Sequence, residues 1–450
     1  MFIGRKQELA FLENIYQSND LNFVCLTGTS QIGKTSFLKH FSNRKHSAYY
    51  GIKNLPSPIN QLNFCTEMDL QNFKANSSWK NTLTLICQQA VNEKIIFIID
   101  NAQNLEVNFP ELLYYLIDII KNQKKFLRLS IIFSGTVTNY IQTTLSKNNI
   151  KYHSLTLSAL NFEETIEYLE SFTQEEKLLL YGITGGIPKI LSQINFNITF
   201  KDNLYNLFYN PNAMFLNIGE EILKQHFRKV EIYHSILSAI AAGNLKLNDI
   251  AQLLNIESNK LSKYINVLIK EDFLKRINKL DESGNKKNRQ TFYIIKSTMI
   301  IFWYKHVFPY QSSILANLGN NILRNKVLNS LDSYGRTLFL RIGYEYCLTL
   351  KKRNNFSINF SILGITWKPE LKTENDLRIL ALNQQEVCFI QCIWDKTKVD
   401  INILIKFQQD FTAYKNVYYI LISKKGFTDK ALAYAAQKNN WRLISLFYLK

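Results

Sequence analysis

Residues 23–38 read FVCLTGTSQIGKTSFL, and this stretch decides the fold of the N-terminal part of the chain. The apolar residues before Gly28 predict a buried strand, and the residues from Lys34 predict the first turn of a helix. A loop bounded by Gly28 and Gly33 lies between them and is followed by Lys and Thr. This order is that of a phosphate-binding P-loop. The stretch therefore predicts a nucleotide-binding α/β domain.

The residue types in this loop suit the binding of ATP. Glycines let the backbone approach phosphates closely, while loop N–H groups and the helix N-terminus supply partial positive charge. Lys34 is expected to reach the β- and γ-phosphates, and the Thr35 hydroxyl to bind Mg²⁺. A chance glycine turn is the alternative, and the flanking strand and helix argue against it. The predicted nucleotide-binding residues are Gly28, Thr29, Ser30, Gln31, Ile32, Gly33, Lys34, Thr35 and Ser36.

Length and charge set the limits for the rest of the chain. A chain of 450 residues is too long for one core, so about two to four domains are expected. Lys and Arg outnumber Asp and Glu by 54 to 36, which favours nucleic acid or another polyanion as a partner. A basic surface without such a partner is the alternative. Scattered cysteines without CxxC pairs, and no apolar run of membrane-spanning length, predict a reduced cytoplasmic protein that does not contact membranes.

A second landmark is KIIFIIDNAQ at residues 94–103. A continuous apolar run is typical of a parallel strand buried on both faces, and ligands bind at the C-terminal ends of such strands. Asp100 stands at that end and is the predicted Walker B acid, which holds Mg²⁺ through its water shell. The alternative is an Asp that only caps a loop.

Two further stretches add candidate residues. The apolar run 127–133 ends in Ser134-Gly-Thr, and a small hydroxyl there can bond the γ-phosphate or the attacking water, so Ser134 is predicted as a sensor. An ordinary strand-ending turn is the alternative. The stretch YGITGGIPKIL at residues 181–191 places two glycines and Pro188 in a helical pattern, which predicts a tight turn beside another part of the protein.

Four segments together resemble the archaeal-type ATPase family, in the AAA+ and STAND branch of P-loop NTPases. They are FIGRKQEL at 2–9, the loop at 28–35, FIID at 97–100 and YGITGGIP at 181–188. The resemblance covers essentially the whole chain, and it implies that the loop with Pro188 lies against the nucleotide base or sugar. The family usually carries Glu where this chain has Asn101. Asn orients a water but cannot accept its proton, so assistance of roughly 10²–10⁴-fold is missing and slow or partner-dependent ATP hydrolysis is expected. The predicted catalytic residues are Lys34, Asp100, Asn101 and Ser134, and the predicted metal ligands are Thr35 and Asp100.

From residue 231 the pattern changes to three short helices followed by two alternating strands, which predicts a winged helix-turn-helix. Gly243 is expected to end the first helix, and Ser258 to cap the third. Such domains contact DNA or serve as protein-interaction modules, and both readings stay open. The predicted DNA-binding residues are Lys260 and Lys263 on the third helix and Lys286, Lys287 and Arg289 in the wing. The aromatic run that follows, with Trp303, is expected to belong to the core.

The last part of the chain predicts a small mixed α/β domain and resembles the family's domain of unknown function, related to the PD-(D/E)xK nuclease superfamily. That superfamily uses an Asp and a Glu-x-Lys to bind a metal and activate water. Here Asp376 stands at the first position, but Gln391 replaces the Glu and Ile393 replaces the Lys. Without the second carboxylate and the Lys, no nuclease activity is expected.

The sequence thus predicts an α/β multidomain protein, with a P-loop parallel sheet, a helical lid, a winged helix-turn-helix and a C-terminal mixed α/β nuclease-like domain. We expect an ATP-binding, Mg²⁺-dependent switch that acts on double-stranded DNA. The competing prediction is a STAND-like signalling scaffold that binds ATP, associates with itself or a protein partner, and does not contact DNA. The predicted boundaries are 1–160 for the P-loop domain, 161–230 for the lid, 231–300 for the winged helix, 301–330 for a helical bridge and 331–450 for the degenerate nuclease-like domain.

Overall fold

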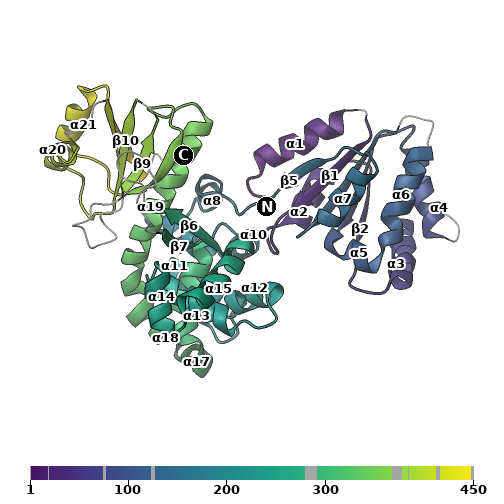
Figure 1. Cartoon of the computed structure of the whole chain (residues 1–450), viewed down its shortest axis with the longest axis horizontal. Coiled ribbons are helices and arrows are strands. Elements are labelled where there is room, and N and C mark those ends of the chain that lie inside the picture. Colours follow the sequence, from purple (N-terminus) through teal and green to yellow (C-terminus); the bar gives the residue numbers. More distant parts are fainter. Residues whose placement is uncertain are drawn as a thin grey trace. The chain divides into compact units, whose positions relative to one another are not determined.

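The computed structural model describes residues 2–18, 20–73, 78–122, 127–278, 291–366, 378–383, 385–411 and 416–446 (Figure 1). The chain divides into two compact units. The first consists of Met1–Leu160 and Ile187–Ser192, and the second of Asn161–Gly186 and Gln193–Lys450. No helix within the described residues has the length and hydropathy needed to cross a membrane.

The first unit is built on a five-stranded parallel sheet with the strand order β2-β3-β4-β1-β5. The phosphate loop follows β1, and the acid at the end of β3 is separated from it by β4. The α/β class and the parallel sheet predicted from the apolar runs are confirmed. The strands are β1 (Asn22–Thr27), β2 (Ser47–Gly51), β3 (Ile95–Asp100), β4 (Leu129–Gly135) and β5 (His153–Thr156).

Both faces of this sheet are buried, which explains the continuous apolar runs. Successive residues of a strand point to opposite faces, so Val24 and Leu26 pack on one side while Phe23 and Cys25 pack on the other. Helices α1 (Lys6–Gln17) and α2 (Lys34–Ser42) cover the first of these faces. The opposite face is covered by α3 (Ser57–Asp69), α4 (Trp79–Gln89), α5 (Leu105–Asn108), α6 (Pro110–Asn122) and α7 (Asn139–Lys147).

The predicted lid region is divided between the two units. Helices α8 (Phe162–Tyr168) and α9 (Gln174–Thr184) belong to the second unit, and each begins with a capping box. Gly185 and Gly186 have left-handed backbones, with φ of 63° and 65°, and end α9 as the tight turn predicted. Helix α10 (Pro188–Leu191) then belongs to the first unit. Residues 161–230, the predicted lid, therefore contribute to both units.

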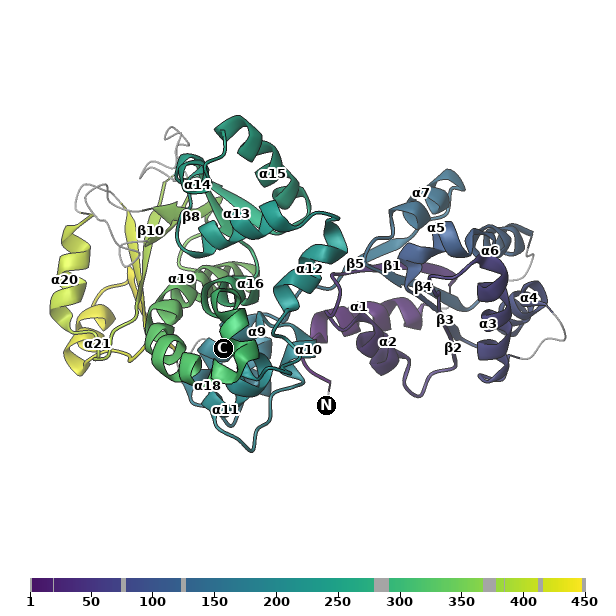
Figure 2. The same cartoon turned by 90° about the horizontal axis from the view of Figure 1, so that it is seen from below.

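Three helices and an antiparallel hairpin follow α11 (Phe200–Leu204), η2 (Tyr205–Tyr209) and α12 (Ile218–His226). Figure 2 shows the three helices close together in the second unit. Gly243 lies just after the first of them, as predicted. Ser258 is instead the first residue of the third helix, whose N-cap is Glu257 without a side-chain cap, so the predicted cap is wrong. The elements are α13 (Glu231–Ala241), α14 (Leu247–Leu254), α15 (Ser258–Lys270), β6 (Leu274–Asn278) and β7 (Thr291–Ile295).

A run of helical segments leads from the hairpin to the C-terminal domain and forms the core of the second unit. Trp303 is fully buried, and its indole N–H donates to the Leu216 carbonyl at 2.8 Å. A Cβ on Gly219 would lie 2.3 Å from the Trp303 ring, so α12 packs directly against it. The expectation that Trp303 belongs to the core is confirmed. The segments are α16 (Thr298–Phe302), η3 (Trp303–Val307), η4 (Phe308–Tyr310), α17 (Gln311–Ser313), η5 (Ile314–Leu318), α18 (Gly319–Ile322), η6 (Leu323–Val327) and α19 (Leu328–Lys352).

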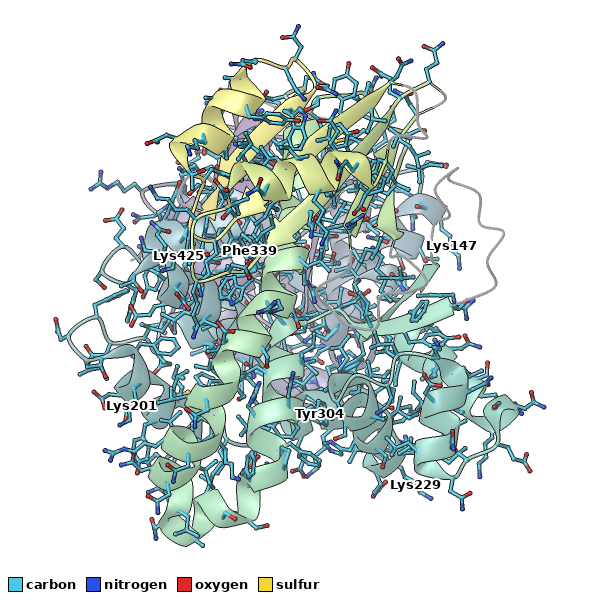
Figure 3. The ribbon with its side chains drawn as sticks, turned by 90° about the vertical axis from the view of Figure 1, so that its left-hand side faces the viewer. Lys147, Lys201, Lys229, Tyr304, Phe339 and Lys425 are labelled. Atoms are coloured by element: carbon cyan, nitrogen blue, oxygen red, sulfur yellow. The ribbon has the colours of Figure 1, made fainter. Side chains whose placement is uncertain are left out.

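The C-terminal domain is a second five-stranded sheet with the order β12-β11-β10-β9-β8. Strands β10, β11 and β12 are parallel, and β8 and β9 run antiparallel to their neighbours, which gives the mixed sheet that was predicted. Phe339, labelled in Figure 3, points from α19 toward this sheet and packs on Trp394 with ring centroids 5.4 Å apart. The elements are β8 (Ile362–Thr366), β9 (Arg378–Leu382), β10 (Val387–Ile393), α20 (Ile401–Gln409), β11 (Val417–Ser423), α21 (Asp429–Ala436) and β12 (Trp441–Ser445).

Polar contacts join the C-terminal domain to the lid helices inside the second unit. The ammonium of Lys424, which is 5% exposed, lies 2.7 Å from Glu175 on α9 and 3.8 Å from Asp332 on α19. Arg353 at the end of α19 makes two 2.8 Å bonds to the Glu163 carboxylate on α8. These charge-assisted bonds fix α8 and α9 to α19 and to the end of β11.

Candidate nucleotide site

The phosphate loop has the backbone geometry that the two glycines require. A Cβ on Gly28 would lie 2.7 Å from the Leu157 carbonyl oxygen, so only glycine fits there. Gly33 has φ of 85°, a left-handed conformation that glycine adopts without strain, and α2 begins at the next residue. The N-terminus of α2 therefore opens directly onto the loop, as an anion site at a helix N-terminus requires.

Lys34 lies over this loop and is held by it. Its ammonium donates to the carbonyl oxygens of Gly28 at 2.7 Å and Thr29 at 3.0 Å. Burial lowers the pKa of Lys34, and the charge of Asp100 opposes this shift. The ammonium is thus pre-positioned at the loop, where phosphate oxygens would replace carbonyl groups as its partners.

Asp100 stands at the end of β3 within a cluster of hydrogen-bond donors. Its Oδ2 accepts from the Thr35 hydroxyl at 2.6 Å and from the Tyr49 hydroxyl at 2.6 Å, and its Oδ1 accepts from the Asn101 N–H at 2.9 Å. Burial would raise the pKa of Asp100, but these donors and the nearby Ser134 hydroxyl outweigh it and hold the pKa below its usual value. The carboxylate is therefore ionised at neutral pH and faces the hydroxyl of Thr35.

A cavity of about 500 Å³ lies at the C-terminal ends of the strands and joins these groups. A larger hollow of about 770 Å³ opens between Leu21–Phe23 and Asn149–His153, away from the phosphate loop, and contains none of its residues. The smaller cavity therefore contains the phosphate-loop residues and Asp100, at the place where ligands bind in open α/β sheets. Its lining residues are Phe2, Ile3, Arg5, Ser30, Gln31, Ile32, Gly33, Lys34, Thr35, Ser36, Phe37, Asp100, Asn101, Gln103, Thr136, Pro188, Lys189 and Ser192.

Most of the residues that were predicted from the sequence to bind nucleotide meet in this cavity. Gly28 and Thr29 do not line it and instead hold Lys34 through their carbonyl groups. Ser134 is fully buried beside Asp100 and also does not line the cavity, whereas Thr136, two residues further along, does. Pro188 lies against Gly33, because a Cβ on that glycine would be 3.6 Å from the proline.

Other residues of the cavity were not predicted as site residues. Gln103 accepts from the Thr136 N–H through its Oε1 at 3.2 Å and so ties the turn after β3 to the turn after β4. Arg5 is 3% exposed and donates to the carbonyl of Ser158 at 2.5 Å and to that of Ile32 at 3.4 Å. Arg5 thus fastens the N-terminal segment to the phosphate loop of its own domain.

The donor set suits a Mg²⁺-nucleotide. It combines a glycine-bounded loop at a helix N-terminus with the Lys34 ammonium, the Thr35 hydroxyl and the ionised Asp100 carboxylate. Thr35 and Asp100 would hold the metal, which when bound neutralises phosphate charge. A phosphate loop on one strand of a parallel sheet, with an acid two strands away, defines the class of P-loop ATPase-like domains.

Comparison with known proteins identifies two families that match parts of the chain. Residues 2–194 match a family described as an ATPase domain predominantly from Archaea, and residues 303–404 match one described as "Archaea bacterial proteins of unknown function". The N-terminal part of the chain is therefore similar to this archaeal ATPase domain, and its C-terminal part to the second family.

Three similar proteins illustrate this relationship. An uncharacterized protein of Methanocaldococcus jannaschii is 26% identical over 407 residues, which cover 88% of each chain. An uncharacterized ATP-binding protein of the same organism is 42% identical over 45 residues, or 10% of this chain and 76% of that protein. The Walker-type ATPase of Pyrococcus abyssi is similar in structure, with a TM-score of 0.48 and 16% identity over 68% of this chain and 96% of that one.

Helix α15 presents a second candidate surface. Six of its side chains are exposed, and none is acidic. Arg276 on β6 is also exposed, and it donates to Asn266 at 3.3 Å, which extends the basic surface onto the hairpin. The predicted wing residues Lys286, Lys287 and Arg289 lie outside the described residues. The exposed residues of α15 are Asn259, Lys260, Lys263, Asn266, Val267 and Lys270.

Gln391 and Ile393, the two positions that depart from the predicted nuclease motif, lie on β10 of the C-terminal sheet. Gln391 is half-buried and pairs in register with Leu421, while Ile393 is buried. Asp376 lies outside the described residues. Within the described part of the chain, no three His, Cys, Asp or Glu side chains gather as a metal site.

Proposed function

We propose that this protein is an ATP-dependent switch that contacts double-stranded DNA through α15. ATP and Mg²⁺ are its ligands in the cavity beside the phosphate loop. The basic outward face of α15 is the observation that carries the DNA contact. The element order α13, α14, α15 and hairpin matches that of a winged helix, in which the third helix enters the major groove.

The arrangement of charges on α15 supports this proposal. Lys260, Lys263 and Lys270 repeat at helical spacing, so with 3.6 residues per turn they share one side of the helix. Two asparagines lie on the same side, and amide groups can bond base edges while lysines neutralise phosphates. Since α15 contains no acidic residue, no carboxylate on it opposes a phosphate backbone.

The polar bonds of the second unit join the lid helix α9 to the C-terminal domain. Helix α9, which ends in the Gly185-Gly186 turn before α10, is bonded through Glu175 to Lys424. We propose that ATP and ADP favour different positions of this turn, because a ligand shifts a two-state equilibrium only through differential contacts. The nuclease-like domain acts here as a structural partner of the lid, without a nuclease reaction.

The test of the DNA contact is fluorescence anisotropy with labelled duplex DNA over a salt series, with Mg-ATP, Mg-ADP or no nucleotide. Binding should weaken steeply with salt, and the double variant Lys260→Ala/Lys263→Ala should reduce the slope of log K against log salt by about two. Lys201→Ala is the control, because Lys201, labelled in Figure 3, lies on α11, outside the helices α13, α14 and α15.

The outcomes separate the two candidate functions. Salt-sensitive binding that shifts with nucleotide and is weakened only by the α15 variant supports the DNA switch. Absence of DNA binding in every nucleotide state contradicts it and leaves the STAND-like scaffold, which light scattering would then test through nucleotide-dependent self-association.

Hydrolysis of ATP should be slow because Asn101 supplies no general base. Asn101 has φ of 54°, a left-handed conformation that Asn tolerates better than Glu. We therefore expect Asn101→Glu to raise kcat by about 10- to 100-fold. This increase is at or below the low end of the roughly 10²–10⁴-fold that a general base contributes. Phosphate release at saturating Mg-ATP measures this.

Asn101→Gln controls for side-chain length without adding a carboxylate. Its kcat should remain well below that of Asn101→Glu. Equal rates for the two variants, or ordinary ATPase turnover by the unmodified protein alone, would show that Asn101 does not limit hydrolysis.

A further inference from the structure

Tyr49 reaches the metal-binding acid from a strand that carries no part of the phosphate loop. It lies on β2, the edge strand beside β3, and its hydroxyl donates to Asp100 Oδ2 at 2.6 Å. The same oxygen accepts from the Thr35 hydroxyl at 2.6 Å. Two hydroxyl groups therefore share one carboxylate oxygen, and only one of them comes from a residue that would itself bind Mg²⁺.

The position of Tyr49 is fixed by contacts other than Asp100. Its backbone N–H donates to Gln71 Oε1 at 2.7 Å, and Gln71 Nε2 donates back to the Tyr49 carbonyl at 2.8 Å. These bonds occupy the edge of β2, where no further strand of the described residues pairs. The ring packs against the apolar cluster between the sheet, α1 and α2. Backbone and ring are thus held in place before any ligand arrives.

This arrangement gives the two hydroxyl groups different tasks when Mg²⁺-nucleotide binds. Thr35 would offer a lone pair of its hydroxyl oxygen to the metal while its proton is still donated to Asp100, so its position would depend on both groups. Tyr49 is not a ligand and can keep its bond. We propose that Tyr49 is a positioning residue that holds the Asp100 carboxylate in its metal-binding orientation. The hydroxyl acts through Asp100, as partners of metal-binding carboxylates do elsewhere. This inference rests on the proposed ATP binding and specifies how its metal dependence arises.

The test is the gain in ATP affinity that Mg²⁺ provides to the full-length protein. Dissociation constants for ATP are measured by calorimetry in saturating Mg²⁺ and in EDTA, and their ratio gives the gain. Tyr49→Phe should reduce this ratio about tenfold, the size expected for losing a hydrogen bond to a charged group. Affinity in EDTA should change less than about twofold, because Tyr49 does not line the cavity.

Tyr50→Phe is the matched control on the next residue of the same strand. Its hydroxyl is buried and bonds instead to the Asn60 carbonyl at 2.8 Å and to the Asn60 side chain at 2.9 Å. Tyr50→Phe removes the same group without touching Asp100 and should leave the ratio unchanged. A second check is Asp100→Asn, in whose background Tyr49→Phe should have no further effect on the ratio.

The results distinguish failure of this inference from failure of the proposed function. An unmodified protein that does not bind ATP would overturn the function itself. Normal Mg²⁺-dependent binding, with a ratio in Tyr49→Phe equal to that of the unmodified protein, would overturn only the role of Tyr49. Equal weakening in Mg²⁺ and EDTA would also overturn it, because that pattern indicates a general structural effect.

Discussion

Lys34→Ala is expected to weaken ATP binding by about 10²- to 10³-fold. The Lys34 ammonium already makes two short bonds to loop carbonyl groups, and phosphate oxygens would take their place when ATP binds. Each hydrogen bond to a charged group contributes about 1.5–3 kcal/mol, and about 1.4 kcal/mol corresponds to a tenfold change in affinity. Competition with a fluorescent ATP analogue measures the loss in the full-length protein.

Lys39→Ala serves as the control because Lys39 lies on the same helix, α2, with its side chain exposed and outside the cavity. Its loss should change ATP affinity less than about twofold, since exposed charges contribute little. Unchanged binding by Lys34→Ala would exclude the phosphate loop as the ATP site.

Trp303→Ala should destabilise the second unit by about 3–5 kcal/mol. The indole is completely buried, its N–H is bonded to the Leu216 carbonyl, and α12 packs on its ring at Gly219. Truncation to Ala therefore leaves a large cavity and removes the shorter of two hydrogen bonds to the Leu216 carbonyl, which also accepts from Gln311 at 3.3 Å. Urea unfolding followed by circular dichroism measures the change.

Two further variants provide a comparison for the stability loss expected of Trp303→Ala. Trp303→Phe keeps most of the apolar volume but removes the N–H, so it should lie between Ala and the unmodified protein. Leu315→Ala truncates a side chain that is 58% exposed in the same helical run and should cost less than about 0.5 kcal/mol. A Trp303→Ala loss no larger than that of Leu315→Ala would contradict the packing described.

The nucleotide site was largely predictable where its parts are contiguous in sequence. Strand, loop and helix follow one another from residue 22 to residue 42, so the placement of Lys34 and Thr35 at the loop depends on local order alone. Asp100 could be identified because an acid ends a fully apolar strand. Ser134 was less predictable, because it lies inside β4 and is fully buried, whereas Thr136, just after the strand, lines the cavity.

Residues that depend on strand order could not be predicted. Tyr49 meets Asp100 only because β2 lies beside β3. No sequence feature near Tyr49 indicates that these two strands pair. Gln103 and Arg5 likewise act across the ends of different strands. The division of the lid also depends on long-range packing, because α9 is covered by α19, which lies far along the chain. A Cβ on Gly182 would be 2.1 Å from Leu338.

The path of the chain between the two units determines how the protein can be divided. It leaves the first unit after Leu160, returns for Ile187–Ser192, and leaves again. A fragment that ends at residue 160 lacks Pro188, Lys189 and Ser192 from the cavity lining. A fragment that ends at residue 192 keeps them but also carries α8 and α9 without α19, their packing partner. A cut at either residue therefore separates segments that pack together in the full chain.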